Sequence, residues 1–249
     1  MIVPPRPGLV FLLSLVATTL SSMSGGSASL LTTPTWIALG YPLPAALASD
    51  KLAGALWTLA GARNYLRHRS VDWRLVGAMM VVGTAAAYLG TRLTSDLDPA
   101  RLTPIIGALI LGAVALVAFR PTIGNGTHPP RLSRPVTAAT ALPLGFYEGM
   151  FGSGNSIPAT LLFAVGRGYD FIQALGHYYL LAAVWCASAA MSYSSRGFFE
   201  PALALPATAG AVVGGYLGSR LGHRFGVRVV RGIFLVAGTA LGGKLLLGW

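Results

Sequence analysis

Charged residues are scarce in this chain. Asp, Glu, Lys and Arg together make up 10% of its 249 residues, whereas soluble domains carry about a quarter. Hydrophobic residues make up 54%. The composition therefore excludes an ordinary soluble domain and indicates an integral membrane protein.

The sequence also lacks the motifs that several functional classes need. Its one cysteine, Cys186, excludes an intramolecular disulfide. No Cys/His cluster has the spacing of a metal site, and no Walker lysine motif is present for ATP hydrolysis. Neither Gly-x-Ser-x-Gly nor His-Glu-x-x-His occurs. We therefore expect no enzyme activity, no metal and no cofactor.

Acidic residues are scarcer than basic ones, with 7 Asp and Glu against 18 Lys and Arg, for a formal net charge of +11. The basic residues sit in short loops between apolar runs, which is typical of loops that face the cytoplasm and anionic lipid. The expected partners are therefore the lipid bilayer and a small anionic substrate rather than nucleic acid. The oligomeric state is left open.

Long stretches carry no charge at all, and the longest runs from Pro7 to Ser49. Because a membrane span needs about 20 apolar residues, these stretches predict an all-α integral membrane protein with about eight transmembrane helices. The spans are expected near 8–33, 44–66, 72–93, 102–119, 136–165, 171–195, 201–221 and 229–248. Residues 1–26 also fit a signal peptide, but a counterpart later in the chain favours a span.

The second half of the chain repeats the first at an offset of 128 residues. The run Tyr88–Leu93 recurs as Tyr216–Leu221. Four further matches at this offset pair Gly40-Tyr41 with Gly168-Tyr169, Ala46-Leu47 with Ala174-Leu175, Tyr65 with Tyr193, and Asp72 with Glu200. The chain is thus expected to hold one four-helix repeat over 1–120, a loop over 121–134 and a second four-helix repeat over 135–249.

Four spans per half is an even number, which predicts that both halves share one orientation. This arrangement is a parallel repeat about an axis along the membrane normal. With this topology more Lys and Arg residues fall on the side that holds both termini. Both termini are therefore expected in the cytoplasm.

The stretch from Phe146 to Pro158 combines a carboxylate, glycines and small polar residues inside an apolar segment. Glu148 is the only charged residue between Arg134 and Arg167, and an isolated charge inside a membrane segment marks function by default. A second glycine stretch runs from Gly25 to Pro34 in the first half. We predict two broken glycine-rich helices whose unwound backbone can bind an anion.

Topology places further polar groups at the same level. Asp50 and Lys51 are adjacent, so on a helix they point about 100° apart and need other partners. We hypothesise that Lys51 pairs with Glu148 or with a bound anion, and that Asp50 or Glu148 exchanges protons. The alternative is a structural ion pair between two helices.

The predicted site collects these groups from both halves. Arg92 and Arg220, which end corresponding spans, are candidate anion contacts, with snorkelling to the interface as the alternative. The residues expected to bind the substrate are Gly25, Gly26, Ser27, Lys51, Gly152, Ser153, Gly154, Asn155 and His177.

These residues resemble motifs of the TauE/SafE family of sulfite exporters and organosulfonate or sulfite permeases, over almost the whole chain. The markers are Leu47–Leu52, Ser70–Trp73, Gly145–Gly154, and Gly90-Thr91-Arg92 with its copy Gly218-Ser219-Arg220. The resemblance implies a small eight-span carrier of sulfur-containing or related anions in a bacterial inner membrane. Asp50 replaces an amide common in the family, and His177-Tyr178-Tyr179 replaces a frequent His-Thr-Lys.

Residues and resemblance together predict a secondary transporter of small anions such as sulfite or sulfoacetate, coupled to protons or ions. One alternative is an anion channel or a scaffold. The other is an intramembrane hydrolase that uses Ser153 or Ser156 with His177.

Overall fold

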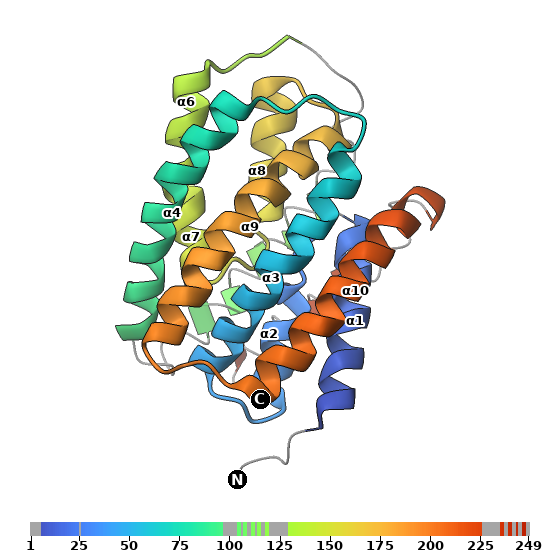
Figure 1. Cartoon of the computed structure of the whole chain (residues 1–249), viewed down its shortest axis with the longest axis vertical. Coiled ribbons are helices and arrows are strands. Elements are labelled where there is room, and N and C mark those ends of the chain that lie inside the picture. The colour runs from blue at the N-terminus through green and yellow to red at the C-terminus, as the bar shows by residue number, and fades with distance from the viewer. Residues whose placement is uncertain are drawn as a thin grey trace.

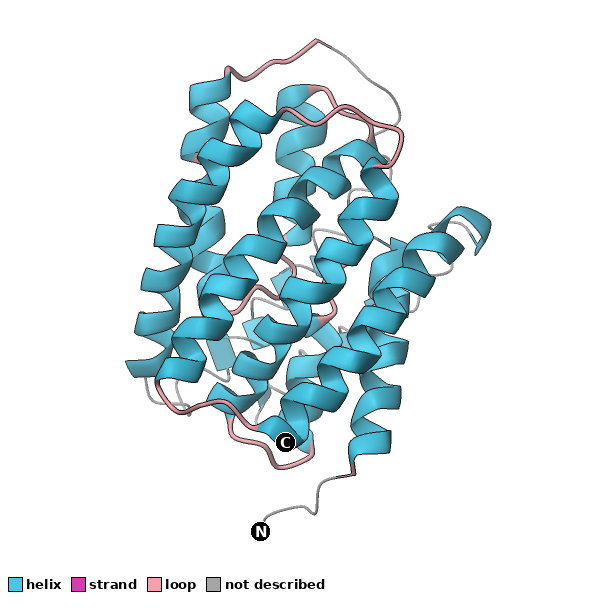
Figure 2. Cartoon of the chain, in the orientation of Figure 1, coloured by secondary structure: helices cyan, strands magenta, loops and turns pink. Residues whose placement is uncertain are grey.

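The computed structural model of the protein describes residues 6–24, 26–96 and 129–225, with scattered positions within 104–119 and 235–247. Every regular element in this part of the chain is a helix (Figure 1, Figure 2). The all-α architecture is therefore confirmed. Gly25 and much of the expected spans 102–119 and 229–248 lie outside the described residues.

Four long helices form the body of the molecule: α3 (Leu43–Leu66), α4 (Trp73–Asp96), α9 (Phe171–Ser195) and α10 (Pro201–Phe225). The sequence explains where they begin. Pro44 lies in the first turn of α3, and Asp170 caps α9 by accepting hydrogen bonds from the backbone N–H groups of Ile172 and Gln173 at 3.0 Å. Stretches within α4, α9 and α10 are long and apolar enough to cross a membrane.

Both glycine stretches break a helix, as predicted. In the first half, α1 (Pro7–Ser24) gives way to α2 (Ser29–Ala38). The second half continues from α6 (Arg134–Ala139) and α7 (Ala141–Met150) to α8 (Ser156–Leu161) and the π-helix η1 (Leu162–Gly166). Each break starts with the same turn, in which a glycine N–H closes the helix: Gly26 donates to Ser21 O at 2.8 Å, and Gly152 donates to Tyr147 O at 3.0 Å.

Each broken segment turns back on itself. Val10 near the start of α1 packs in one cluster with Trp36 near the end of α2. At the other end of the molecule, the N–H groups of Arg131 and Leu132, just before α6, donate to Gly166 O at 2.9 and 2.8 Å. Residues 7–38 and 134–166 therefore form two re-entrant hairpins, which we call hairpin 1 and hairpin 2. The expectation that 8–33 and 136–165 each cross the membrane as one broken span is wrong, because the chain reverses at the breaks.

Helix contacts fix the direction of each helix. Helices α1 and α10 run parallel, because Leu15 faces Gly214 and Thr19 faces Gly218. Helices α4 and α7 also run parallel, because Gly83 faces Gly145 and Ala87 faces Gly149. Helices α3 and α9, in contrast, run antiparallel, because Gly54 faces Cys186 and Gly61 faces Tyr179.

Helices that correspond at the offset of 128 therefore run in opposite directions. Since α4 follows α3 through a short loop and α10 follows α9 in the same way (Figure 1), α4 also opposes α10, and α1 opposes α7. The predicted parallel repeat is wrong. It rested on an even number of spans per half, and a re-entrant hairpin adds no crossing to that number.

The two halves nevertheless share local structure. Helices α3 and α9 begin 128 positions apart, as do α4 and α10. Tyr65 donates a hydrogen bond to Ser22 O near the end of α1, and Tyr193 donates one to Met150 O at the end of α7 at 3.2 Å. These partners also lie 128 positions apart. One tyrosine per half thus holds the outgoing arm of its hairpin just before the break.

An ion cluster joins the start of α4 to hairpin 2. Asp72 accepts a hydrogen bond from Arg134 at 2.8 Å and lies 3.6 Å from Arg167. Burial alone raises the pKa of Asp72, but the hydrogen bonds from Arg134 and the backbone of Leu75, with the charges of both arginines, outweigh it and lower the pKa. The cluster fixes the open end of hairpin 2 against the loop between α3 and α4.

The close contact between α4 and α7 leads to a testable prediction. A Cβ atom on Gly90 of α4 would lie 2.1 Å from Phe146 O of α7, whereas one on Gly77 of the same helix would meet nothing within 4 Å. We expect Gly90→Ala to lower the free energy of unfolding by about 1–3 kcal/mol through overpacking. Gly77→Ala should cause no loss. Thermal unfolding in detergent checks this, and equal effects of both substitutions would contradict the packing.

Candidate functional site

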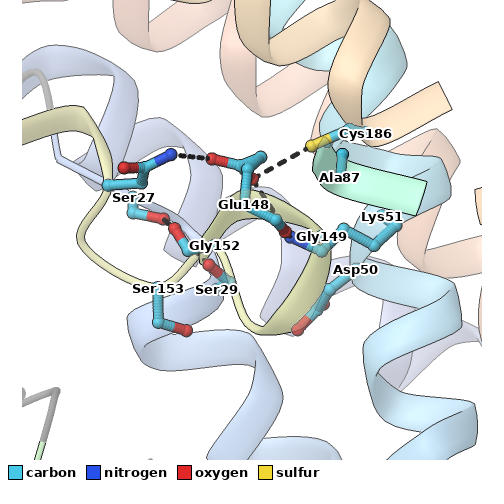
Figure 3. A network of polar contacts seen from close by, with 12 residues as sticks. Ser27, Ser29, Asp50, Lys51, Ala87, Glu148, Gly149, Gly152, Ser153 and Cys186 are labelled. Carbon is cyan, nitrogen blue, oxygen red and sulfur yellow. Dashed lines mark hydrogen bonds and ion pairs between the residues drawn. The ribbon is translucent and has the colours of Figure 1, made fainter. Parts of the chain in front are cut away.

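A buried ion pair connects α3 to hairpin 2. Lys51 Nζ lies 3.0 Å from Glu148 Oε1, and the two side chains are only 3% and 5% exposed. Lys51 also donates a hydrogen bond to the carbonyl oxygen of Glu148. The pairing expected between these two residues is therefore present (Figure 3).

Glu148 accepts further hydrogen bonds from three neutral groups. Asn155 Nδ2 and the Tyr178 hydroxyl donate to Oε2 at 2.7 and 3.0 Å, and the Cys186 thiol donates to Oε1 at 3.2 Å. These donors come from hairpin 2 and from α9. Because each carboxylate oxygen has a donor, the buried charge is well satisfied where it lies.

Gly152 makes the approach of the pair possible. Its φ is +69°, and a Cβ atom there would lie 2.3 Å from both Glu148 Oε1 and Lys51 Nζ. Gly154 also has positive φ, at +80°. These glycines let the backbone reverse beside the ion pair, which no side chain at position 152 would permit.

The tips of the two hairpins meet at this point. Ser27 Oγ donates a hydrogen bond to Gly152 O at 3.2 Å and shares a 2.8 Å hydrogen bond with Ser29 Oγ (Figure 3). Gly26 is buried beside them. Ser27 and Gly152 are 125 residues apart in the sequence. The two glycine breaks thus lie together in the structure, as the sequence predicts.

Asp50 has a different set of partners from Lys51. Its carboxylate accepts hydrogen bonds from the Thr33 hydroxyl and from Trp36 Nε1 at 2.9 Å, both on α2. Asp50 is 9% exposed and has no cation within ion-pair distance among the described residues. The adjacent acid and base thus hold different hairpins, Asp50 holding hairpin 1 and Lys51 holding hairpin 2.

A small cavity lies between these groups. About 30 Å³ is open to the centre of a water-sized sphere, which is room for about two water molecules. Thr18, a fully buried residue of α1, also lines it, and its hydroxyl has no hydrogen-bond partner in the described part of the chain. The charged and hydrogen-bonding residues that line the cavity include Ser27, Asp50, Lys51, Glu148, Tyr178 and Cys186.

The glycine turn of hairpin 2 holds further free polar atoms. The hydroxyls of Ser153 and Ser156 and the Oδ1 atom of Asn155 are buried, and no partner for them occurs among the described residues. Buried polar groups are normally paired. These atoms are therefore available to water or to a polar ligand.

His177 lies outside the cavity, near the start of α9 and close to Asp72. Its Nδ1 faces Gln173 O at 2.7 Å and its Nε2 accepts a hydrogen bond from the backbone N–H of Asp72 at 3.4 Å. The ring also packs on Tyr169, with centroids 4.7 Å apart. Both ring nitrogens have backbone partners, and neither Ser153 nor Ser156 is among them. His177 is therefore not at the cavity, where it was predicted to contact the substrate. The serine–histidine pair of the hydrolase alternative is not formed either.

Arg92 and Arg220 do not reach the cavity either. Each is exposed and lies over a tyrosine four residues earlier on its own helix, Tyr88 at 5.0 Å and Tyr216 at 4.8 Å. Because α4 and α10 are antiparallel, the two arginines lie at opposite ends of the bundle. They are not placed to contact one anion together, since each extends outward from the end of its helix.

Tyr178, Cys186, Thr33 and Trp36 are contacts of the site that sequence reasoning missed. One signal could have found Tyr178, which lies 128 positions after Asp50 and so corresponds to it in the second half. Cys186 corresponds in the same way to Thr58, and both line the cavity. Neither residue carries a motif of its own.

Comparisons with known proteins agree with this membrane architecture. A protein of Haemophilus influenzae named as a probable membrane transporter is 28% identical over 170 residues, covering 68% of this chain and 66% of the relative. A probable membrane transporter of Sinorhizobium, ORF9, is 26% identical over 68% of this chain and 64% of its own length. The chain thus matches just under two thirds of these two relatives.

A third relative covers nearly the whole chain. The probable membrane transporter YfcA of Escherichia coli is 25% identical over 99% of this chain and 91% of its own length. No solved structure matches the chain. The family described as sulfite exporter TauE/SafE matches residues 10–245. This match spans both hairpins and all four long helices, and the chain therefore belongs to the TauE/SafE family.

Proposed function

We propose that the protein is a secondary transporter of small anions, in particular sulfur-containing oxyanions or organosulfonates, coupled to protons or ions. The observation that carries the proposal is the position of Lys51. Its ammonium group lies beside a cavity at the point where two oppositely directed hairpins meet. Discontinuous helices that meet near the bilayer midplane are a recurrent plan for transport sites.

The geometry supports an inverted repeat with its axis in the membrane plane. In this arrangement α3, α4, α9 and α10 cross the bilayer, and the hairpins enter from opposite sides. The spans expected at 102–119 and 229–248 complete the two halves. This assignment replaces the parallel arrangement expected from the number of spans.

The same topology reverses the proposed orientation. Among the described residues, three arginines lie on the side where α1 begins, namely Arg6, Arg92 and Arg196. The opposite side holds nine: Arg63, Arg67, Arg69, Arg74, Arg131, Arg134, Arg167, Arg220 and Arg224. We therefore place the loop between α3 and α4 in the cytoplasm and the start of α1 outside, in a bacterial inner membrane.

Anion binding requires a rearrangement of the cavity. Sulfite has four non-hydrogen atoms, whereas the cavity has room for about two water molecules. Lys51 is also occupied by Glu148. An entering oxyanion therefore has to take the place of the Glu148 carboxylate at Lys51 Nζ, and a proton on Glu148 would lower the cost of that exchange.

Flux measurements in reconstituted vesicles test the proposal. Labelled sulfite, sulfoacetate, taurine and thiosulfate are offered with and without a pH gradient, and at least one should accumulate against its gradient when protons can flow. The Arg92→Ala variant, which removes an exposed cation outside the cavity, should retain the flux. Passive conductance that is unaffected by Glu148→Gln would instead favour a channel.

A further inference from the structure

Asp50 is a buried acid in the cavity wall that the Lys51–Glu148 pair leaves without a counter-charge. In the described part of the chain its carboxylate is held by neutral donors, among them Thr33 and Trp36 of α2. The nearest ammonium, on Lys51, is directed to Glu148 at 3.0 Å. When it is ionised, an acid held by neutral donors carries an uncompensated negative charge inside the bundle.

The charges around the cavity therefore do not balance. Among the described residues, two carboxylates, Asp50 and Glu148, face a single ammonium group on Lys51. The other titratable groups at the wall are the Cys186 thiol and the Tyr178 hydroxyl of α9, which are uncharged as hydrogen-bond donors to Glu148. The polar side chains that the described residues of hairpin 1 supply here are hydroxyl and indole groups. With both acids ionised, the described residues of the site carry one excess negative charge, which opposes entry of an anion.

We infer that Asp50 is a proton-binding site whose occupancy admits the anion and controls the hold of α3 on α2. A proton on Asp50 removes the excess charge. It also converts charge-assisted hydrogen bonds from Thr33 and Trp36 into weaker neutral ones. Because α2 is the returning arm of hairpin 1 and Ser27 at the tip of that hairpin touches Gly152, loosening α2 opens the junction between the hairpins. The link to anion entry rests on the proposed transport function.

The proton site itself is tested without any transport assay. Infrared spectra of the full-length protein in lipid, recorded as the pH is lowered, should show carbonyl bands of protonated carboxylic acids, and one of these bands should grow over the pH range in which the emission of Trp36 changes. Asp50→Asn should remove that band, and the matched variant Glu148→Gln should keep it. Emission from Trp36, identified by its loss in Trp36→Phe, should change over the same pH range. Persistence of that band in Asp50→Asn overturns the inference.

The coupling is tested with sodium sulfite as the probe. For one linked proton, sulfite affinity of the unaltered protein should rise by up to about tenfold per pH unit as the pH falls through the titration of Asp50. In Asp50→Asn the affinity should vary less than about twofold over that range. An unchanged pH dependence in Asp50→Asn would refute the coupling. If neither protein binds any of the anions, the transport proposal fails, while the infrared titration still decides whether Asp50 takes up the proton.

Discussion

Lys51→Met is expected to reduce anion flux to below about 1% of the unaltered protein. The substitution removes the one ammonium group that the described residues bring to the cavity, and it leaves Glu148 buried with neutral donors. Removing one partner of a buried charge pair at a binding site costs about 2–5 kcal/mol of binding free energy, and about 3 kcal/mol already corresponds to a loss of a hundredfold or more. Flux per assembled protein in vesicles measures the effect.

A double variant separates transport from folding. Lys51→Met combined with Glu148→Gln removes both charges of the ion pair, so position 148 carries no carboxylate that has lost its partner, and the assembled protein should be recovered in normal amounts. If Lys51 binds the anion, the double variant stays inactive. Recovery of flux in the double variant would mean that the pair only holds α3 against hairpin 2.

Gly152→Ala is expected to have the largest effect on stability. A non-glycine residue at positive φ costs about 1–3 kcal/mol. Here the added Cβ would also lie 2.3 Å from each member of the ion pair. Separating that pair adds about 3–5 kcal/mol. We therefore expect little folded protein, and no flux from what remains.

Gly197 supplies the matched control. Its φ is +80°, yet a Cβ atom there would meet nothing within 4 Å, so Gly197→Ala isolates the backbone cost. Comparing the thermal midpoints of the two variants in detergent gives the contribution of the close approach. Similar midpoints would show that the ion pair tolerates displacement.

The sequence was informative where a local rule decides the structure. The isolated charge at Glu148 and the glycines beside it predicted a break, and Lys51 was matched with its partner across 97 residues. The four long helices also lie within a few residues of their expected bounds.

The direction of the chain after a break could not be predicted in the same way. An apolar segment with Gly26 or Gly152 in it satisfies the length rule for a span whether it continues or reverses. Reversal depends on contacts made far away in sequence, such as Arg131 and Leu132 with Gly166. One such choice per half changed the relation of the repeats from parallel to inverted, and with it the proposed orientation.

The side-chain partners of the site were hidden for a related reason. Arg92 and Arg220 occupy corresponding positions, and a parallel repeat would have put them at one level. In the antiparallel arrangement they are at opposite ends. Asp50 accepts a hydrogen bond from Trp36. Hydropathy alone indicates only a packing role for this tryptophan, so the contact could not be predicted.

The opposed direction of the two hairpins also bears on which way solute moves. A backbone that looks alike from either compartment has no built-in rectification, so net flow would follow the electrochemical driving forces. The asymmetry lies in side chains: where the first half has Asp50 and Lys51, the second has Tyr178 and Tyr179. The adjacent acid and base, Asp50 and Lys51, thus occur in the first half and not at the corresponding positions of the second. Any kinetic preference between import and export would originate from this difference.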